Sequence, residues 1–133
     1  MKKILLDTNF LLAVYQFKVD IFSEIRRICN FNYEIYVLDK TIDELRNIVE
    51  KQKGKDKEAA KIALRLLKIK NVGVIGTSSK ERTDDAILDY AKKGYLVATH
   101  DKDLKRMLIN HAIEVIVLKQ KKILAIANDR GFL

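Results

Sequence analysis

Short apolar runs alternate with longer amphipathic segments along this chain. The apolar runs are rich in Ile, Val and Leu, which is typical of strands that are covered on both faces. They predict five strands, Lys3–Leu6, Glu34–Leu38, Val72–Ile75, Leu96–Thr99 and Val115–Leu118.

Helical periodicity fills the segments between these runs. The predicted helices are Phe10–Tyr15, Ile21–Cys29, Ile42–Glu50, Lys57–Lys70, Asp84–Lys93 and Asp103–Asn110. When strands and helices alternate, the crossover connections are almost always right-handed and the strands are parallel. We therefore predict a single three-layer α/β domain that spans residues 1–133.

Composition narrows the class of protein. Apolar residues make up 48% of the 133 residues, which is enough for a sizeable core. The single cysteine, Cys29, excludes an internal disulfide and a zinc site built from cysteines. No apolar run is as long as a membrane-spanning helix, and the run after Lys3 is too short for a signal peptide. We expect a soluble cytoplasmic protein with no membrane association.

The net charge of +8 arises from 26 Lys and Arg residues against 18 Asp and Glu residues. A basic surface attracts polyanions, and nucleic acid is the usual one. The same surplus would also serve solubility alone, so charge leaves both interpretations open.

Acidic residues follow each of the first four predicted strands. They are Asp7 at the end of the first strand, Glu44 in the first turn of the helix after the second, Asp84 and Asp85 at the start of the helix after the third, and Asp101 and Asp103 after the fourth. The carboxyl ends of parallel strands lie on one edge of a sheet, where ligands bind. We therefore expect these carboxylates to gather at one rim.

Helix capping is the simplest alternative for each acid. The candidate caps are Asp7 or Asn9 before Phe10, a capping box from Thr41 to Glu44, Thr83 ahead of Asp84 and Asp85, and Asp101. Capping needs no charge, however, and several carboxylates close together repel one another strongly. A hard divalent cation relieves that repulsion, and Mg²⁺ and Mn²⁺ prefer oxygen ligands. The cluster therefore predicts a Mg²⁺ or Mn²⁺ site.

Four segments at these positions resemble the motifs of the PIN-domain ribonucleases. They read ILLDTNFLL, TIDELRNI, TDDAIL and VATHDKDLKRML, and the resemblance extends from Lys3 to Leu118. The last two are most similar to the archaeal and eukaryotic branch associated with ribosomal RNA processing. The toxin branch of toxin–antitoxin pairs more often has an aromatic residue after the second aspartate, where this chain has Leu104.

The resemblance implies a PIN-like α/β/α sandwich whose parallel five-stranded sheet has the order 3-2-1-4-5. It also implies that one or two divalent ions are held by Asp7, Glu44, Asp85 and Asp101. Asp85 is the implied ligand because the family's ligand usually stands directly before a small and an aliphatic residue. The residues expected to orient ligands, waters or the phosphate are Asn9, Asp84, Asp103, Thr8 and Thr99, and for the two threonines bonds to nearby backbone are an equal alternative.

The implied activity is a Mg²⁺- or Mn²⁺-dependent ribonuclease, expected to be an endonuclease. The ion would lower the pKa of a water molecule and offset charge that develops on the phosphate. Lys102, Lys105 and Arg106 follow the fourth motif and are expected to contact the RNA backbone without reading bases.

Three other functions could use the same class of fold. A phospho-receiver domain would need an aspartate at the end of the third strand, where the residues from Val74 to Thr77 include no acid. A non-catalytic RNA-binding or assembly module would not need to retain the acids. A toxin would share the chemistry and differ in its RNA target. The partners implied are RNA with an antitoxin or a ribosome-assembly protein, and a homodimer is compatible with the sequence.

Overall fold

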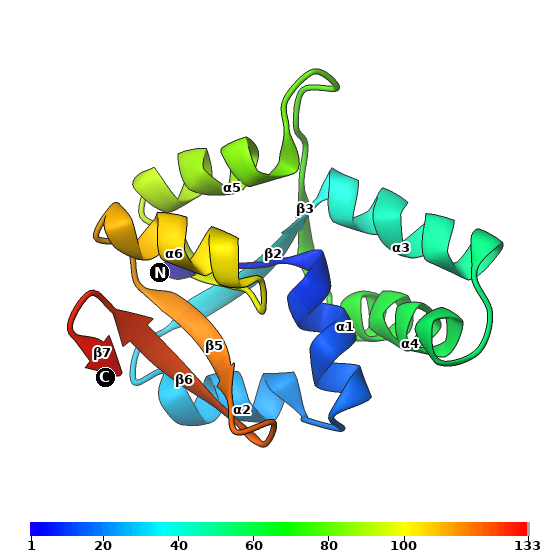
Figure 1. Ribbon diagram of the computed structural model, residues 1–133, viewed down its shortest axis with the longest axis horizontal. Coiled ribbons are helices and arrows are strands. Elements are labelled where there is room, and N and C mark those ends of the chain that lie inside the picture. Colours follow the sequence, from blue (N-terminus) through cyan, green and yellow to red (C-terminus); the bar gives the residue numbers. More distant parts are fainter. Residues whose placement is uncertain (133) are drawn as a thin grey trace.

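One mixed sheet runs through the protein, with helices in the connections between its strands (Figure 1). The computed structural model describes residues 1–132, and over these residues seven strands lie in the order β3-β2-β1-β4-β5-β6-β7. The strands are β1 (Lys2–Leu6), β2 (Tyr33–Leu38), β3 (Gly73–Ile75), β4 (Leu96–Ala98), β5 (Val115–Lys119), β6 (Ile123–Asn128) and β7 (Gly131–Phe132). The helices are α1 (Thr8–Gln16), α2 (Ile21–Ile28), α3 (Asp39–Lys51), α4 (Lys55–Ile69), α5 (Thr83–Lys92) and α6 (Lys102–Asn110).

The predicted elements are all present, and the first five strands are parallel in the expected order 3-2-1-4-5. The prediction of a five-stranded sheet is wrong, because β6 and β7 add two antiparallel strands. The sequence does not signal this hairpin because the turn into β6 lacks the usual turn residues. Gln120 and Lys121 adopt φ angles of 55° and 57°, a left-handed conformation that Gly or Asn usually signals.

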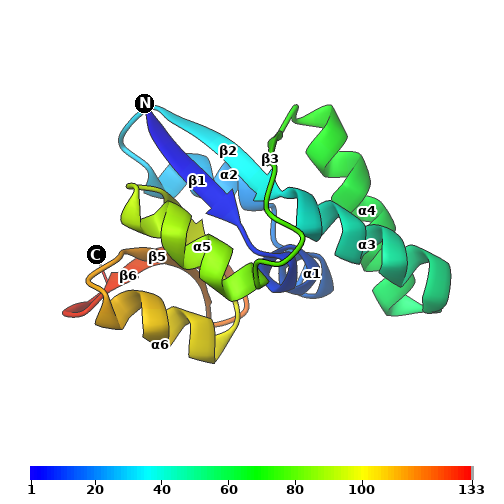
Figure 2. The ribbon, with the colours of Figure 1, turned by 90° about the horizontal axis from the view of Figure 1, so that it is seen from above.

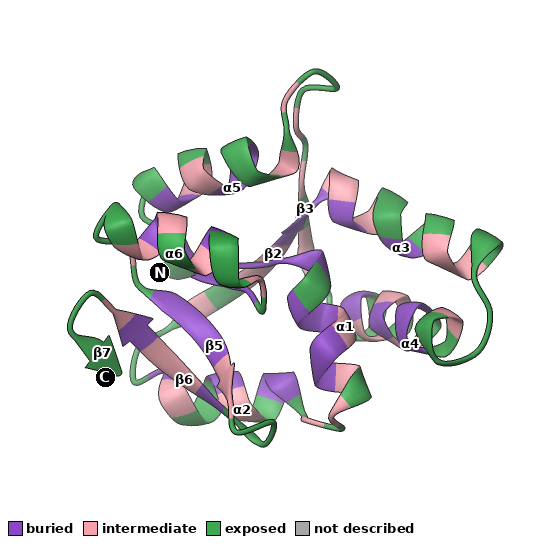
Figure 3. Ribbon diagram, viewed as in Figure 1, coloured by how far each residue is buried: buried purple, intermediate pink, exposed green. Residues whose placement is uncertain are grey.

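Alternate residues of β1 enter two separate apolar clusters. Ile4 and Leu6 pack in one cluster with Phe10 of α1, and Leu5 packs in the other with Ile87 of α5 and Leu108 of α6. This division follows from the two-residue period of a strand that is buried on both faces. Figure 3 shows β5 largely buried, while exposed residues lie on the outer sides of the helices. Within residues 1–132 no helix is long and apolar enough to cross a bilayer.

The strand connections bring several helix starts to one edge of the sheet. β1 leads directly into α1, β2 into α3 and β4 into α6, while a longer loop joins β3 to α5. Figures 1 and 2 show the amino ends of α1, α3, α5 and α6 around the carboxyl ends of these strands. The acidic residues predicted at this edge can therefore lie close together.

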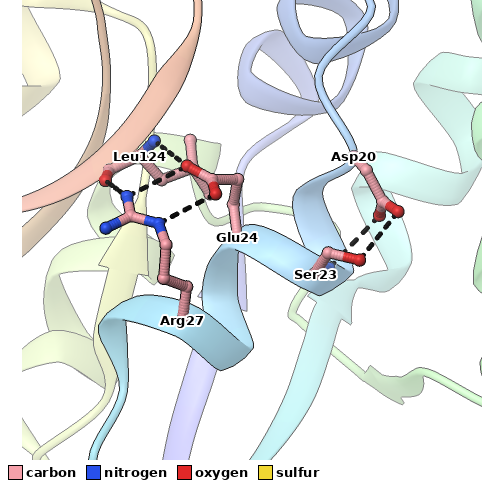
Figure 4. Close-up of polar contacts among 5 residues, drawn as sticks. All are labelled: Asp20, Ser23, Glu24, Arg27 and Leu124. Atoms are coloured by element: carbon pink, nitrogen blue, oxygen red, sulfur yellow. Dashed lines mark hydrogen bonds and ion pairs between the residues drawn. The ribbon is translucent and has the colours of Figure 1, made fainter.

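Side chains of α2 bind the backbone of β6 (Figure 4). Glu24 Oε1 accepts a hydrogen bond from Leu124 N at 2.9 Å, and Arg27 Nη2 donates to Leu124 O at 2.9 Å. Arg27 Nε also pairs with Glu24 Oε2 at 2.9 Å. The helix itself is capped by Asp20, which accepts from Ser23 N at 3.2 Å and from Ser23 Oγ at 2.8 Å. This pair of charged side chains ties α2 to the hairpin. It occupies the N–H and C=O of Leu124 in the part of β6 that β7 does not pair, groups that could otherwise bind another chain.

We expect Glu24→Ala to lower the free energy of unfolding by about 1–3 kcal/mol, because it leaves Leu124 N–H and Arg27 without a charged acceptor. Glu58→Ala is the matched control, since its ion pair with Lys61 is exposed and 3.9 Å long, and it should change stability by less than about 0.5 kcal/mol. Urea denaturation measures both values. Equal losses in the two variants would show that the contact with β6 contributes nothing specific.

Candidate functional site

Asp7 is the one buried acidic side chain among residues 1–132, with 7% of its surface exposed. It follows β1 and is the N-cap of α1. Its Oδ1 accepts from Thr8 N at 2.9 Å, and its Oδ2 accepts from the Thr99 hydroxyl at 2.9 Å. Its own N–H donates to Ala98 O at 2.9 Å, which joins β1 to β4. The carboxylate is thereby fixed at the centre of the sheet's carboxyl edge.

The two neighbouring threonines connect this carboxylate to other helices. Thr99 Oγ1 also accepts from Asp101 N at 3.1 Å, so one hydroxyl links Asp7 to the start of α6. Thr8 Oγ1 donates to Thr41 Oγ1 at 3.0 Å and thus joins α1 to α3. Thr41 had no expected role beyond a possible cap. Its partner lies 33 positions away, so only the folded chain reveals the contact.

Burial raises the pKa of Asp7 to about 6, against the lowering effect of its hydrogen bonds with Thr99 and Thr8. The negative charges of Glu44 and Asp84 raise this pKa further. Burial likewise raises the pKa of Glu44, and the charge of Asp84 adds to the effect. The carboxylate that caps α1 and the carboxylates on α3 and α5 therefore act on one another electrostatically, and a bound cation would relieve their repulsion.

Two of the candidate capping arrangements are absent. α3 begins at Asp39, so Thr41 lies inside the helix and Glu44 lies in its second turn instead of its first. The capping box therefore does not form. α5 begins at Thr83, and its N-cap is Arg82, which makes no side-chain capping bond. Asp84 and Asp85 still lie in the first turn of α5, where the helix dipole favours negative charge.

Asp84 and Asp85 differ in their electrostatic effect on the other acids. Adjacent residues of a helix point about 100° apart, so both side chains cannot face the same carboxylate. Asp84 is the member of the pair whose charge raises the pKa of both Asp7 and Glu44. Asp84 therefore acts on both carboxylates, while the assignment of Asp85 as an ion ligand stays a prediction.

Asp101 is the N-cap of α6, in agreement with the capping alternative from the sequence. Its Oδ1 accepts from Asp103 N at 2.8 Å and from Leu104 N at 3.0 Å. Capping occupies Oδ1 alone, so Oδ2 is compatible with a further ligand. Asp103 is exposed, and its Oδ1 lies 3.9 Å from Arg106 Nη1.

The cations expected to contact RNA share one side of α6. Lys102, Lys105 and Arg106, together with Ile109, line an open hollow of about 360 Å³. Their spacing of three and four residues places them on the same helix face. The basic groups and the Asp101 cap therefore belong to one helix.

The donor set suits a hard divalent cation. All the acids at this edge offer carboxylate oxygens, which Mg²⁺ and Mn²⁺ prefer. In the part of the chain that the structure describes, no three acidic, histidine or cysteine side chains already converge as an ion would require. Asp7 is fixed, whereas Glu44, Asp84 and Asn9 are exposed. The exposed carboxylates of Glu44 and Asp84 are therefore free to turn, as a shared ion would require.

Comparison with solved structures supports the fold. The PIN domain endonuclease Utp24 matches with a TM-score of 0.76 and 23% identity, over 93% of this chain and 90% of the other. A domain of a functionally unknown protein from Methanocaldococcus jannaschii matches with a TM-score of 0.63 and 18% identity, over 90% of this chain and 92% of the other. At these identities the matches establish a shared α/β fold.

Sequence comparison assigns the family. Ribonuclease VapC4 of Methanocaldococcus jannaschii is 40% identical over 124 residues, covering 92% of this chain and 94% of the relative. Ribonuclease VapC9 of Archaeoglobus fulgidus is 33% identical over 118 residues, covering 87% of this chain and 82% of the relative. The family described as PIN like domain matches residues 4–121. The resemblance seen in the four sequence motifs is confirmed, and the chain belongs to the PIN-like domain family.

Proposed function

We propose that this protein is a ribonuclease that depends on Mg²⁺ or Mn²⁺ and cuts RNA internally. The observation that carries the proposal is the buried Asp7, whose carboxylate faces further negative charge from Glu44 and Asp84. A fold does not gain stability from such an arrangement, whereas a cation site needs it. The two relatives named as ribonucleases support RNA as the substrate.

Asp7, Glu44 and Asp84 would hold the ion, with Asp101 contributing its second carboxylate oxygen. This set exchanges Asp85 for Asp84 because Asp84 acts on both of the other acids. When bound, the divalent ion supplies Lewis-acid polarisation of the scissile phosphate and lowers the pKa of water. Thr99 holds the Asp7 carboxylate in place through its 2.9 Å hydrogen bond.

RNA must approach an acidic edge, so neighbouring positive charge is needed to position its backbone. Lys102, Lys105 and Arg106 meet that need on α6, directly after Asp101. Phosphate contacts of this kind carry no sequence preference. Both roles considered from the sequence, ribosomal RNA processing and the toxin of a toxin–antitoxin pair, would use the same cleavage.

The test compares two conservative changes at adjacent positions. We expect Asp84→Asn to lower Mn²⁺-dependent cleavage of labelled single-stranded RNA by at least about 100-fold, since it removes an ion ligand. Asp85→Asn makes the same charge change one residue away and should retain most activity. Wild-type cleavage should stop in EDTA. An active Asp84→Asn with an inactive Asp85→Asn would restore the assignment made from the motif, and undiminished cleavage in EDTA would refute the metal mechanism.

Burial of Asp7 also predicts how stability depends on pH in the absence of metal. Its pKa is about 6 in the folded protein and about 4 when exposed, so the folded state binds the extra proton between these values. Stability should therefore fall as pH rises from about 4 to 6, by roughly 3 kcal/mol. Asp7→Asn removes this cost, so in EDTA at pH 7 it should melt above wild type, with the difference vanishing near pH 4. A variant that melts below wild type at pH 7 would contradict the account.

A further inference from the structure

Two consecutive residues at the start of α3 hold the loop of residues 76–82, which leads from β3 to α5. This loop extends beyond the helices and passes the amino end of α3 on its way to α5 (Figure 1). A carboxylate binds the beginning of the loop and an ammonium group binds its middle and end, and both side chains come from the first turn of α3.

Asp39 binds the beginning of the loop. Its Oδ1 accepts from the Thr77 hydroxyl at 2.7 Å, and its Oδ2 accepts from Thr77 N at 3.0 Å. Oδ1 also accepts from Lys40 N at 2.7 Å. The hydrogen bonds with the Thr77 side chain and backbone hold the pKa of Asp39 below its usual value, so the carboxylate stays charged near neutral pH.

Lys40 binds the middle and the end of the loop. Its Nζ donates to Ser78 O at 2.9 Å and to Glu81 O. Glu81 N in turn donates to Ser78 O at 3.1 Å, so the two carbonyl groups held by Lys40 belong to one tight turn. A single ammonium group therefore fixes both sides of this turn.

The start of α5 depends on this turn because the helix has no side-chain cap of its own. Arg82, its N-cap residue, follows Glu81 directly and makes no side-chain capping bond. Asp84 lies three residues beyond Glu81, within the first turn of α5. Whatever fixes Glu81 O therefore also fixes the path of the chain into Asp84.

The same helix carries Glu44. Lys40 and Glu44 are four residues apart on α3, which places them on one face of successive turns. α3 thus presents one acid directly and holds the loop that presents a second acid. A shift of the loop would change the distance between Asp84 and the other two carboxylates.

We infer that Lys40, assisted by Asp39, is a positioning residue that sets the place of Asp84 at the acidic edge and thereby the affinity for the divalent ion. This inference rests on the proposed function for the identity of the ligand. The anchoring of the loop by Asp39 and Lys40 does not depend on that function.

The experiment uses Lys40→Met, which keeps the length of the side chain and removes the donor. Arg46→Met is the matched control, because it removes the same charge from an exposed position on the same helix. Limited trypsin digestion followed by mass spectrometry reports on the loop, since Lys80 and Arg82 are exposed cleavage sites within it. Calorimetric titration with MnCl₂ reports on the position of the ligands.

We expect Lys40→Met to accelerate cleavage after Lys80 and Arg82 severalfold and to weaken Mn²⁺ binding by about 10–100-fold, while Arg46→Met changes neither. Lys40→Arg, which still donates to two carbonyls, should restore part of the Mn²⁺ affinity. Unchanged Mn²⁺ affinity in Lys40→Met, with wild type binding normally, would overturn the inference and leave the proposed function intact. If wild type binds no Mn²⁺, the proposed function fails, and unchanged trypsin cleavage of Lys40→Met would then overturn the anchoring as well.

Discussion

The burial of one carboxylate at the end of β1, the middle one of the five parallel strands, is the constraint on which the candidate site depends. Asp7 is held by a backbone N–H from α1 and by the Thr99 hydroxyl, while its own N–H joins β1 to β4. Hydrogen bonds alone do not offset the cost of burying its charge, because its pKa remains raised to about 6. The charged groups that act on this carboxylate, Glu44 and Asp84, are themselves acidic. This arrangement of charges lowers local stability, as is common at ligand-binding sites.

Topology explains how the acids reach this carboxylate. Parallel strands deliver the starts of α1, α3 and α6 to one edge directly, but β3 reaches α5 only through a seven-residue loop, 76–82. A loop of that length would leave the start of α5 poorly fixed, and α5 lacks a side-chain cap. Anchoring by Asp39 and Lys40 supplies the missing restraint. The least regular connection at this edge is thus held by the helix that carries Glu44.

The sequence predicts the parallel part of this fold well because each buried strand is a short apolar run that ends at a polar residue. It fails at β6 and β7, since the turn at Gln120 and Lys121 adopts left-handed angles without Gly or Asn. The sequence also indicates the acids at this edge, since Asp7 directly follows a strand. The sequence does not show which of Asp84 and Asp85 acts more strongly on the other acids, because that depends on where the first turn of α5 faces.

Contacts between distant segments are the other part that periodicity cannot supply. Thr8 with Thr41 and Lys40 with Glu81 join residues far apart in the chain, and no sequence period indicates either contact. The central claim is that Asp7, Glu44 and Asp84 share a cation. A crystal structure of the protein soaked in MnCl₂, with anomalous diffraction at the manganese edge, tests it most directly. The account predicts an anomalous peak bound by Asp7 together with Glu44 and Asp84. Ordered density for these three carboxylates with no peak between them would contradict it.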